Sequence, residues 1–426
     1  MSPSRYPTLA LLRHGEPLRG KDAGRDPGLS PRGGLQARSA AEFLAALQPE
    51  RYVASPARRS AATAEAIAGG RPVELDAALR GLELGGGDEG PLRALDVTRA
   101  LFAQPQTAPF GGESLELLAA RTLPAIQCLL DDRRDAVVVA HRVVNTVVLG
   151  CLLGLPLRSA LFLQHDTGAV NLIEQRSERP IVAGINISPM DPILSAPASR
   201  VLPDSDTTIS RRVYLVRHGA AANVGDDGAL VARTPTPLTA EGADQAHVLG
   251  KWFANHGVTR VYASDIPRAM ATATAIAGQD GVEAVRGLRE IRLGDAGRAS
   301  VQHLFARHPG YLTDPEIAPE GGESSGEAGE RGRRTLDEIL AADPSQDVVV
   351  VAHGGLNRAL AASLLGWPMH AAFSVRCDFG SVTILEQAEG EWWLRTMNWT
   401  PGGLAPRWQL PAIPGLADRH AALVGR

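Results

Sequence analysis

The chain has 426 residues, of which 44% are hydrophobic, and a formal net charge of −4. This length predicts two or three domains, and the hydrophobic fraction is sufficient for a core in each of them. The nearly balanced charge argues against a general affinity for nucleic acid or acidic membranes, and no apolar run approaches the roughly 20 residues that span a bilayer.

The beginning of the chain and its cysteines predict the compartment. The first residues lead directly into a strand and lack the longer apolar core of a secretory signal. Three cysteines, Cys128, Cys151 and Cys377, lie in apolar surroundings without paired or metal-ligand spacing. We therefore expect buried, unpaired thiols in a reducing compartment, and a cytoplasmic protein.

The first strand-like run is Leu9–Leu12, which leads into Arg13, His14 and Gly15. Such a run predicts a buried strand that delivers a cation and an imidazole to its C-terminal end. In open α/β sheets, ligands bind at the carboxyl ends of the strands. The same arrangement occurs again around His218, which makes an internal repeat worth testing.

The chain contains two copies of one pattern. Five landmarks recur in the same order, separated by between 204 residues (His14 to His218) and 212 residues (His141 to His353). The landmarks of the two copies are Arg13–Gly15 with Arg217–Gly219, Ser55–Arg59 with Ser264–Arg268, Gly111–Ser114 with Gly321–Ser324, Val137–His141 with Val349–His353, and Asp166–Val170 with Asp378–Val382. This order and nearly constant spacing predict two copies of one domain.

The boundaries of the copies follow from composition. We expect a first copy over residues 1–187 and a second copy over residues 211–426. Residues 188–210 are rich in Pro, Ser and Asp without sustained periodicity, which predicts an extended linker. Within each copy, apolar strand-like runs alternate with amphipathic stretches rich in Ala and Leu. This alternation predicts two tandem α/β domains, each a three-layer α/β/α sandwich with a mostly parallel central sheet.

Several elements of the second copy have clear sequence bounds. The expected helices and strands are a helix capped by Thr239 and running towards His256, helices over Pro267–Ala277 and Leu356–Leu365, and strands over Val261–Ala263 and Asp347–Ala352. Ser324 and Glu327 have the spacing of a capping box at the start of another helix.

Two histidines of the second copy, His218 and His353, each end an apolar strand, and Arg217 and Arg268 accompany them. A lone histidine at a strand end is more often a hydrogen-bonded structural residue, but the four together make a concave, donor-rich site. Such a site suits a phosphate dianion, which needs several donors and about two compensating charges. Glycines that let backbone N–H groups approach the same anion follow both strands: Gly219, Gly354 and Gly355.

Five short motifs stand in order along the second copy. They are Arg-His-Gly, Ser-x-x-x-Arg-Ala-x-x-Thr-Ala, Leu-x-Glu-Ile, Gly-Gly-Glu-Ser, and a late strand that ends in His-Gly-Gly. Together they resemble the histidine phosphatase (phosphoglycerate mutase-like) superfamily, and the resemblance covers nearly all of both copies. It implies a phosphatase of the histidine acid phosphatase type that hydrolyses a small phosphomonoester through a phosphohistidine, without a metal or cofactor.

The resemblance also implies roles for individual residues. His218 would be the nucleophile, and Arg217, Arg268 and His353 would bind the phosphoryl oxygens. Glu290 would give a proton to the leaving alkoxide and then activate the hydrolytic water. These roles fit the chemistry, because a nucleophilic imidazole must be neutral and a poor leaving group needs a proton donor.

Further phosphate contacts are implied around these residues. Asn223 stands one position earlier than the asparagine usual in the family, and we expect it to contact phosphate. The backbone at Gly219 and Gly354 is expected to do the same.

The first copy departs from the pattern at the acid position. It retains two arginines and two histidines: Arg13, His14, Arg59 and His141. Counted from the shared arginine, however, the position of Glu290 is occupied by Gly81. Glu83 lies two residues on, where an extended segment would place it on the same face, and Asp88 and Glu89 are further candidates.

A second departure follows His141, where Arg142 stands in place of a glycine. The nucleophile and the anion site are therefore retained, while the proton donor is missing or displaced. General acid–base help is typically worth about 10²–10⁴-fold in rate. We expect the first copy to bind phosphate but to turn over ordinary alkyl phosphates slowly.

Two other interpretations stay open. A phosphoglycerate mutase-like phosphotransferase would use the same phosphohistidine, but the 135 residues between His218 and His353 leave modest room for a lid that excludes water. A non-catalytic phospholigand-binding or scaffold protein is the other, especially for the first copy. We expect a small-molecule phosphomonoester as partner, without nucleic acid or membrane, and a homodimer remains open.

Overall fold

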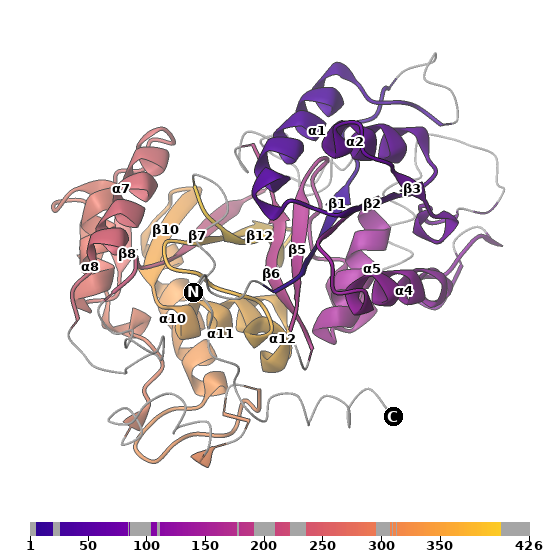
Figure 1. Cartoon of the computed structure of the whole chain (residues 1–426). Helices are drawn as coiled ribbons and strands as arrows, with labels where there is room; N and C mark the ends of the chain where they lie inside the picture. The colour runs from indigo at the N-terminus through magenta and orange to yellow at the C-terminus, as the bar shows by residue number, and fades with distance from the viewer. Residues whose placement is uncertain are drawn as a thin grey trace. The chain divides into compact units, whose positions relative to one another are not determined.

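The computed structural model describes residues 6–19, 26–83, 85, 104–108, 111–176, 179–190, 209–221, 236–294, 307–308, 310–311 and 313–401. The chain divides into two compact units (Figure 1). The N-terminal unit consists of the described parts of Arg5–Ile209 together with Ala388–Met397. The C-terminal unit contains those of Ser210–Gln387 and the residues that follow Met397. No described helix is long and apolar enough to cross a membrane.

The N-terminal unit is built on a mixed sheet. Its strands are β1 (Thr8–Arg13), β2 (Arg51–Ala54), β3 (Glu74–Leu75), β4 (Ala136–Ala140), β5 (Val170–Gln175) and β6 (Pro180–Ile187), in the order β3-β2-β4-β1-β5-β6. Strands β1 to β4 are parallel to one another, and β5 pairs antiparallel with both of its neighbours, β1 and β6. The parallel strands β1 and β4 are continuous apolar runs because both faces are covered.

Helices cover this sheet on both faces (Figure 1). They are α1 (Pro31–Leu44), α2 (Arg58–Ala68), α4 (Leu115–Asp131), α5 (Arg142–Leu153) and the short α6 (Leu157–Ala160), with 3-10 turns η2 (Ala45–Leu47) and η3 (Ala77–Leu79). The start of α1 is fixed by the hydroxyl of Ser30, which accepts from the Gly33 N–H, and the start of α4 by Ser114, which accepts from Leu117.

A strand from the end of the chain completes the N-terminal unit. Strand β12 (Glu391–Trp399) lies beside β6, with Met397 paired to Ile185. Arg395 binds the carboxylate of Asp166 at 2.8 and 3.0 Å, and its backbone carbonyl accepts from the Asn186 side chain at 2.6 Å. Residues more than 200 positions apart are therefore joined in one packing unit.

The C-terminal unit repeats the same plan. Its strands are β7 (Arg211–Arg217), β8 (Val261–Ala263), β9 (Val282–Ala284), β10 (Asp347–Ala352) and β11 (Val382–Ala388), in the order β11-β7-β10-β8-β9. Only the pairing of β11 with β7 is antiparallel among these described pairs. Two tandem α/β domains with mostly parallel sheets are confirmed.

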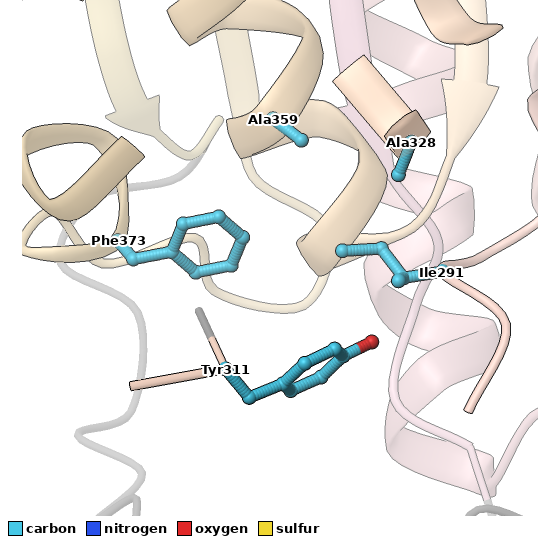
Figure 2. Packing of buried hydrophobic residues seen from close by; sticks show 5 residues of the cluster. All are labelled: Ile291, Tyr311, Ala328, Ala359 and Phe373. Atoms are coloured by element: carbon cyan, nitrogen blue, oxygen red, sulfur yellow. The ribbon is translucent and has the colours of Figure 1, made fainter. Parts of the chain in front are cut away.

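The helices of the C-terminal unit include those expected from the sequence: the bounds Pro267–Ala277 are confirmed, and the helix expected over Leu356–Leu365 begins at Gly354. They are α7 (Ala240–Ala254), α8 (Pro267–Ala277), α10 (Ser325–Ala342), α11 (Gly354–Leu365) and α12 (Met369–Phe373), with the 3-10 turn η5 (Arg286–Leu288). Thr239 caps α7, and Ser324 and Glu327 form the capping box of α10, as predicted. An apolar cluster of Ile291, Tyr311, Ala328, Ala359 and Phe373 packs beside α10 and α11 (Figure 2).

The expectation that all three cysteines are buried is wrong. Cys377 is buried, whereas Cys128 on α4 and Cys151 on α5 are exposed. Both lie on the outer faces of amphipathic helices, where a small apolar side chain carries little penalty. All three thiols are unpaired.

A buried ion pair links β7 to β11 in the C-terminal unit. Arg212 donates from Nε and Nη2 to the same carboxylate oxygen of Glu386, at 3.0 and 2.9 Å. The Glu386 side chain is fully buried. By contrast, the pair between Arg260 and Glu283 is more than half exposed.

These two pairs predict different responses to neutralisation. Glu386→Gln leaves the buried Arg212 with only the half-exposed Asp347 as a counter-ion, 3.4 Å away, so the free energy of unfolding should fall by about 3 kcal/mol. Glu283→Gln is the matched control and should change it by less than about 1 kcal/mol, because its pair is solvated. Urea unfolding of both variants measures the difference. Equal effects would contradict the argument from burial.

Candidate active site

Parallel pairing brings the two histidines of the C-terminal unit together. Arg217, the last residue of β7, pairs with Ala352, the last residue of β10. His218 and His353 follow directly, and their ring centroids lie 5.1 Å apart with the planes at 66°. The expected meeting of two strand ends is therefore present.

Hydrogen bonds fix the tautomer of His218. Its Nδ1 lies 2.7 Å from the carbonyl oxygen of Gly219, which can only accept, so Nδ1 carries the proton. Arg268 Nε donates to His218 Nε2 at 3.0 Å, and a guanidinium has no acceptor. The Nε2 lone pair is thus free of a proton and points towards the arginine side of the site.

The environment keeps His218 neutral. Its side chain is 2% exposed, and this burial lowers the pKa of His218 well below 6.5. The neighbouring His353, Arg217 and Arg268 lower it further. A neutral imidazole with an unprotonated Nε2 is the form that can act as a nucleophile.

Two arginines supply the positive charge. Arg268 also reaches His353, with Nη2 3.4 Å from Nδ1, so it spans both histidines. Arg217 stacks on the ring of Phe379 at 3.7 Å and donates to the carbonyl of Cys377 at 2.5 Å. Its buried Nε has no hydrogen-bond partner among the described residues, which leaves a donor for an anion.

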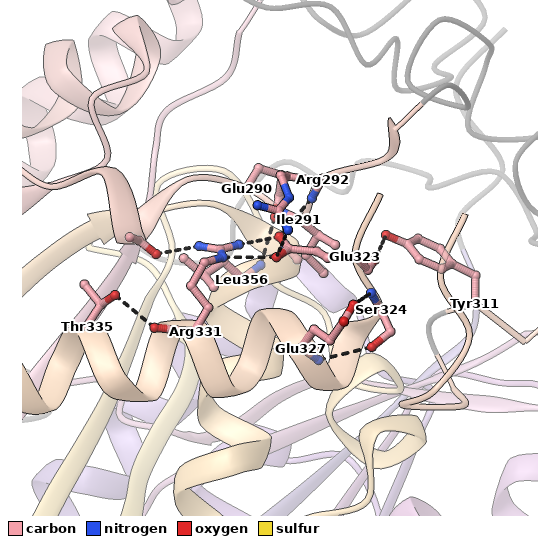
Figure 3. Close-up of polar contacts among 12 residues, drawn as sticks. Glu290, Ile291, Arg292, Tyr311, Glu323, Ser324, Glu327, Arg331, Thr335 and Leu356 are labelled. Atoms are coloured by element: carbon pink, nitrogen blue, oxygen red, sulfur yellow. Dashed lines mark hydrogen bonds and ion pairs between the residues drawn. The ribbon is translucent and has the colours of Figure 1, made fainter. Parts of the chain in front are cut away.

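Glu290 lies at the start of α11. One carboxylate oxygen accepts from the N–H groups of Ile291 and Leu356, each at 2.9 Å, and the other from Gly355 at 3.1 Å (Figure 3). A Cβ at Gly355 would lie 2.6 Å from the Glu290 Oε1, so glycine gives the carboxylate room to approach. The predicted acid is thus beside the helix that His353 begins.

A second carboxylate supports the loop that carries Glu290. Glu323 accepts from Arg331 at 2.6 and 3.2 Å and from the Arg292 N–H at 3.0 Å (Figure 3). Arg331 also donates to the carbonyl of Gly287. The sequence predicts the capping box of Ser324 and Glu327 in this region but not this ion pair. The signal it missed is an acidic and a basic residue eight positions apart in both copies.

Other predicted contacts are placed differently or lie outside the description. The N–H of Gly219 donates to the Thr272 hydroxyl at 3.1 Å, so it is already used inside the protein. Gly354 opens α11, and a Cβ there would lie 3.0 Å from Arg217 Nε. Asn223, Asp88 and Glu89 fall outside the described residues.

The N-terminal site reproduces the same geometry. Arg59 Nε donates to His14 Nε2 at 3.1 Å, and its Nη2 lies 3.4 Å from His141 Nδ1. The histidine rings are 5.2 Å apart. Burial lowers the pKa of His141 to about 3, helped by Arg59 and Arg13. Burial also lowers the pKa of His14, so both imidazoles are neutral near pH 7.

The acid position of the N-terminal site is occupied by Gly81, which has no carboxylate. A Cβ on Gly81 would contact the His141 ring at 3.4 Å, so the position faces the site. The Glu83 side chain is 60% exposed and forms an ion pair with Arg80 at 3.1 Å. The Glu83 carbonyl accepts from the Glu113 N–H, just as the Arg292 carbonyl accepts from the Glu323 N–H. Glu83 is therefore the counterpart of Arg292.

One buried histidine lies behind the N-terminal site. His165 is 3% exposed, and neither ring nitrogen has a hydrogen-bond partner among the described residues. Burial lowers the pKa of His165 to about 3, with smaller contributions from Arg142 and Arg13. Its counterpart in the second copy is Cys377.

Replacement of His165 by cysteine should make folding less sensitive to acid. Below pH 6.5 the unfolded chain binds a proton at this histidine that the folded chain does not bind until about pH 3, so stability falls as pH falls. At pH 5 this one group accounts for about 2 kcal/mol. Urea unfolding at pH 7.5 and pH 5 measures the free energy of unfolding. Its decrease between the two pH values should be smaller by that amount in His165→Cys than in the wild-type protein. The exposed His247→Cys is the control, and equal slopes for all three proteins would contradict the prediction.

A family model places both copies. The model described as the histidine phosphatase superfamily (branch 1) matches residues 9–188 and, separately, residues 213–400. Each match contains the strand ends, the arginines and the histidines of one site. The two matched regions together span most of the chain.

Individual relatives are similar to about half of the chain. Probable phosphoglycerate mutase GpmB of Yersinia enterocolitica is 30% identical over 189 residues, which are 42% of this chain and 87% of the relative. A solved mycobacterial glucosyl-3-phosphoglycerate phosphatase in complex with inorganic phosphate is 28% identical, covering 45% of this chain and 98% of its own, with a TM-score of 0.40. A putative alpha-ribazole-5'-P phosphatase from Escherichia coli is 26% identical, covering 46% and 100%, with a TM-score of 0.40.

Proposed function

We propose that this chain, which belongs to the histidine phosphatase superfamily, hydrolyses a small phosphomonoester mainly at its C-terminal site. The superfamily comprises phosphatases and mutases that act on small phosphorylated molecules. The observation that carries the proposal is the unprotonated Nε2 of the buried, neutral His218, held between Arg217 and Arg268. Such a nitrogen can attack phosphorus while the arginines balance the charge on the phosphoryl oxygens.

The reaction runs in two displacements. His218 Nε2 attacks phosphorus and forms an N–P bond as the P–O bond to the substrate alcohol breaks. Glu290 gives its proton to the departing oxygen and so becomes a carboxylate. That carboxylate then takes a proton from water, whose oxygen attacks the phosphohistidine, and the N–P bond breaks to release inorganic phosphate.

Electrostatic stabilisation comes from fixed side chains. Arg217, Arg268 and His353 lie around the His218 nitrogen, and the buried Nε of Arg217 has no partner among the described residues. Preorganised donors of this kind need no reorganisation as negative charge develops. These residues supply the compensation that phosphoryl transfer requires, so the scheme uses neither a metal nor a cofactor.

The N-terminal site binds phosphate but turns over alkyl phosphates slowly. It retains Arg13, Arg59 and both histidines in the arrangement of the C-terminal site. With Gly81 at the acid position, an alkoxide has to leave without a proton donor.

We also propose that the protein is cytoplasmic, because exposed and unpaired thiols such as Cys128 suit a reducing compartment.

A phosphoglycerate mutase-like transfer is the second candidate. The similarity to a probable phosphoglycerate mutase favours it, since the same phosphohistidine can pass its group to another hydroxyl. Movement of phosphate between positions of one molecule, without phosphate release, would place transfer ahead of hydrolysis.

Covalent labelling tests the phosphohistidine directly. After incubation with ³²P-labelled p-nitrophenyl phosphate and denaturation in alkali, the protein should carry a label that acid removes. The double variant His14→Ala/His218→Ala should carry none. An unlabelled wild type would favour a non-catalytic phospholigand-binding or scaffold protein, and a label that persists in the double variant would exclude these histidines as the nucleophiles.

A further inference from the structure

A buried serine holds the outer nitrogen of the second histidine in both sites. Ser264 Oγ lies 2.8 Å from His353 Nε2, and Ser55 Oγ lies 2.8 Å from His141 Nε2. Both serines are fully buried. Each serine directly follows a short strand, and its N–H donates to a carbonyl of β10 or β4 at 2.9 Å, so the hydroxyl has a fixed position. Both serines stand in the repeated motifs but outside the set of groups that face the phosphoryl oxygens.

The hydrogen bonds define the resting tautomer of His353. Its Nδ1 faces the Nη2 of Arg268 at 3.4 Å, and a guanidinium only donates. Nδ1 is therefore unprotonated, and the proton is on Nε2, which donates to the Ser264 hydroxyl. His353 thus turns a lone pair towards the anion site when that site is free.

A phosphoryl group requires the opposite arrangement. Its oxygens only accept, so a ring nitrogen that faces them must carry a proton. In the free site, burial and the nearby Arg268 and Arg217 lower the pKa of His353 well below 6.5. In the occupied site the same two arginines already balance the charge of a phosphate dianion, so a third positive charge on the ring is not required. The remaining solution is the other neutral tautomer, with the proton on Nδ1 and a lone pair on Nε2.

We propose that Ser264 is a positioning residue that allows His353 to exchange tautomers when phosphate binds. The hydroxyl accepts from Nε2–H in the free site and donates to the bare Nε2 in the occupied site. The ring takes up one proton from water at Nδ1 and returns one from Nε2, so its charge does not change. A backbone carbonyl at this place could only accept and would lock the resting tautomer. This inference rests on the proposed binding of phosphate by His353.

The tautomer can be observed directly. In uniformly ¹⁵N-labelled wild-type protein, the His353 signals, assigned by comparison with His353→Gln, should show the Nε2–H form without ligand. Saturation with inorganic phosphate should convert them to the Nδ1–H form. A His353 ring that keeps its resting tautomer in the phosphate complex, or becomes doubly protonated there, would overturn the proposal.

Substitution provides the second measurement. Ser264→Ala leaves one buried ring nitrogen without a partner in either tautomer, so kcat/KM and phosphate affinity should each fall roughly 10- to 100-fold. The control is Ser325→Ala, which removes an equally buried hydroxyl that has no hydrogen-bond partner among the described residues. Its kinetics should stay within about twofold of wild type. If Ser264→Ala folds and behaves like the control, Ser264 does not position His353.

The two levels of the proposal fail differently. The proposed function, and this inference with it, is contradicted if the wild-type protein binds no phosphate. It is also contradicted if the double variant His14→Ala/His218→Ala keeps the wild-type activity. Normal loss of activity in that double variant, together with an unchanged His353 tautomer, contradicts only the role of Ser264.

Discussion

With Glu290 replaced by glutamine, hydrolysis of an alkyl phosphate falls by about 10²–10⁴-fold in kcat. Glutamine has the same size and an oxygen that can still accept from the N–H groups of Leu356 and Ile291, while its NH2 group cannot accept from the Gly355 N–H. It has no proton to give to the leaving alkoxide. Phosphate release from glycerol phosphate and from p-nitrophenyl phosphate measures the effect.

The aryl substrate separates acid catalysis from positioning. Nitrophenolate is stable without a proton, so Glu290→Gln should slow formation of the phosphohistidine far less with this substrate. Release of nitrophenol in the first turnover reports that step alone. Glu338→Gln, an exposed carboxylate on α10, is the control. An equal loss on both substrates would mean that Glu290 orients the site rather than donating a proton.

In a His218→Ala background, the N-terminal site alone hydrolyses alkyl phosphates at least 100-fold more slowly than the intact protein. The anion-binding geometry around His14 matches that of the C-terminal site, so the deficit should appear in kcat more than in phosphate binding. The missing donor at Gly81 is the cause. A deficit of tenfold or less would contradict this account of the first copy.

Restoring the carboxylate should recover part of that deficit. Gly81→Glu in the His218→Ala background should raise alkyl phosphate hydrolysis at least tenfold. A Cβ at Gly81 has room, because it would meet His141 at 3.4 Å, an ordinary contact distance. Val143 stands where the C-terminal site has Gly355, so Val143→Gly is combined with the substitution to give the carboxylate the same room. Gly81→Gln is the matched control, with the same bulk and no proton to donate. Equal rates for the two variants would show that more than the acid is lacking.

The sequence predicted the fold and the histidine–arginine set because both depend on local patterns. Continuous valine runs predict buried parallel strands, and the predicted bounds of β10, Asp347–Ala352, are those of the structure. Parallel strands end at the same edge of a sheet, so His218 and His353 were expected to meet. The same strand ends and histidines occur in both copies, so each copy supports the prediction made for the other.

Other features depend on contacts that no local pattern encodes. The tryptophans and Thr396 of β12 favour a strand, but no local pattern shows that Met397 pairs with Ile185 in the N-terminal unit. Glu323 supports the Glu290 loop by accepting from the N–H of Arg292, a residue 31 positions earlier in the chain. For Glu83, face alternation favoured a site position, whereas the structure pairs its side chain with Arg80.

The most direct test of the central claim is phosphate release from a panel of small phosphomonoesters by wild type, His14→Ala and His218→Ala. We expect release by wild type, nearly unchanged release by His14→Ala, and a loss of at least 100-fold in His218→Ala, because the C-terminal site alone combines the neutral nucleophile with Glu290. Full activity in both single variants would contradict the assignment of the chemistry to the C-terminal site. A wild type that releases phosphate from none of the substrates would contradict hydrolysis itself and favour phosphotransfer or phospholigand binding.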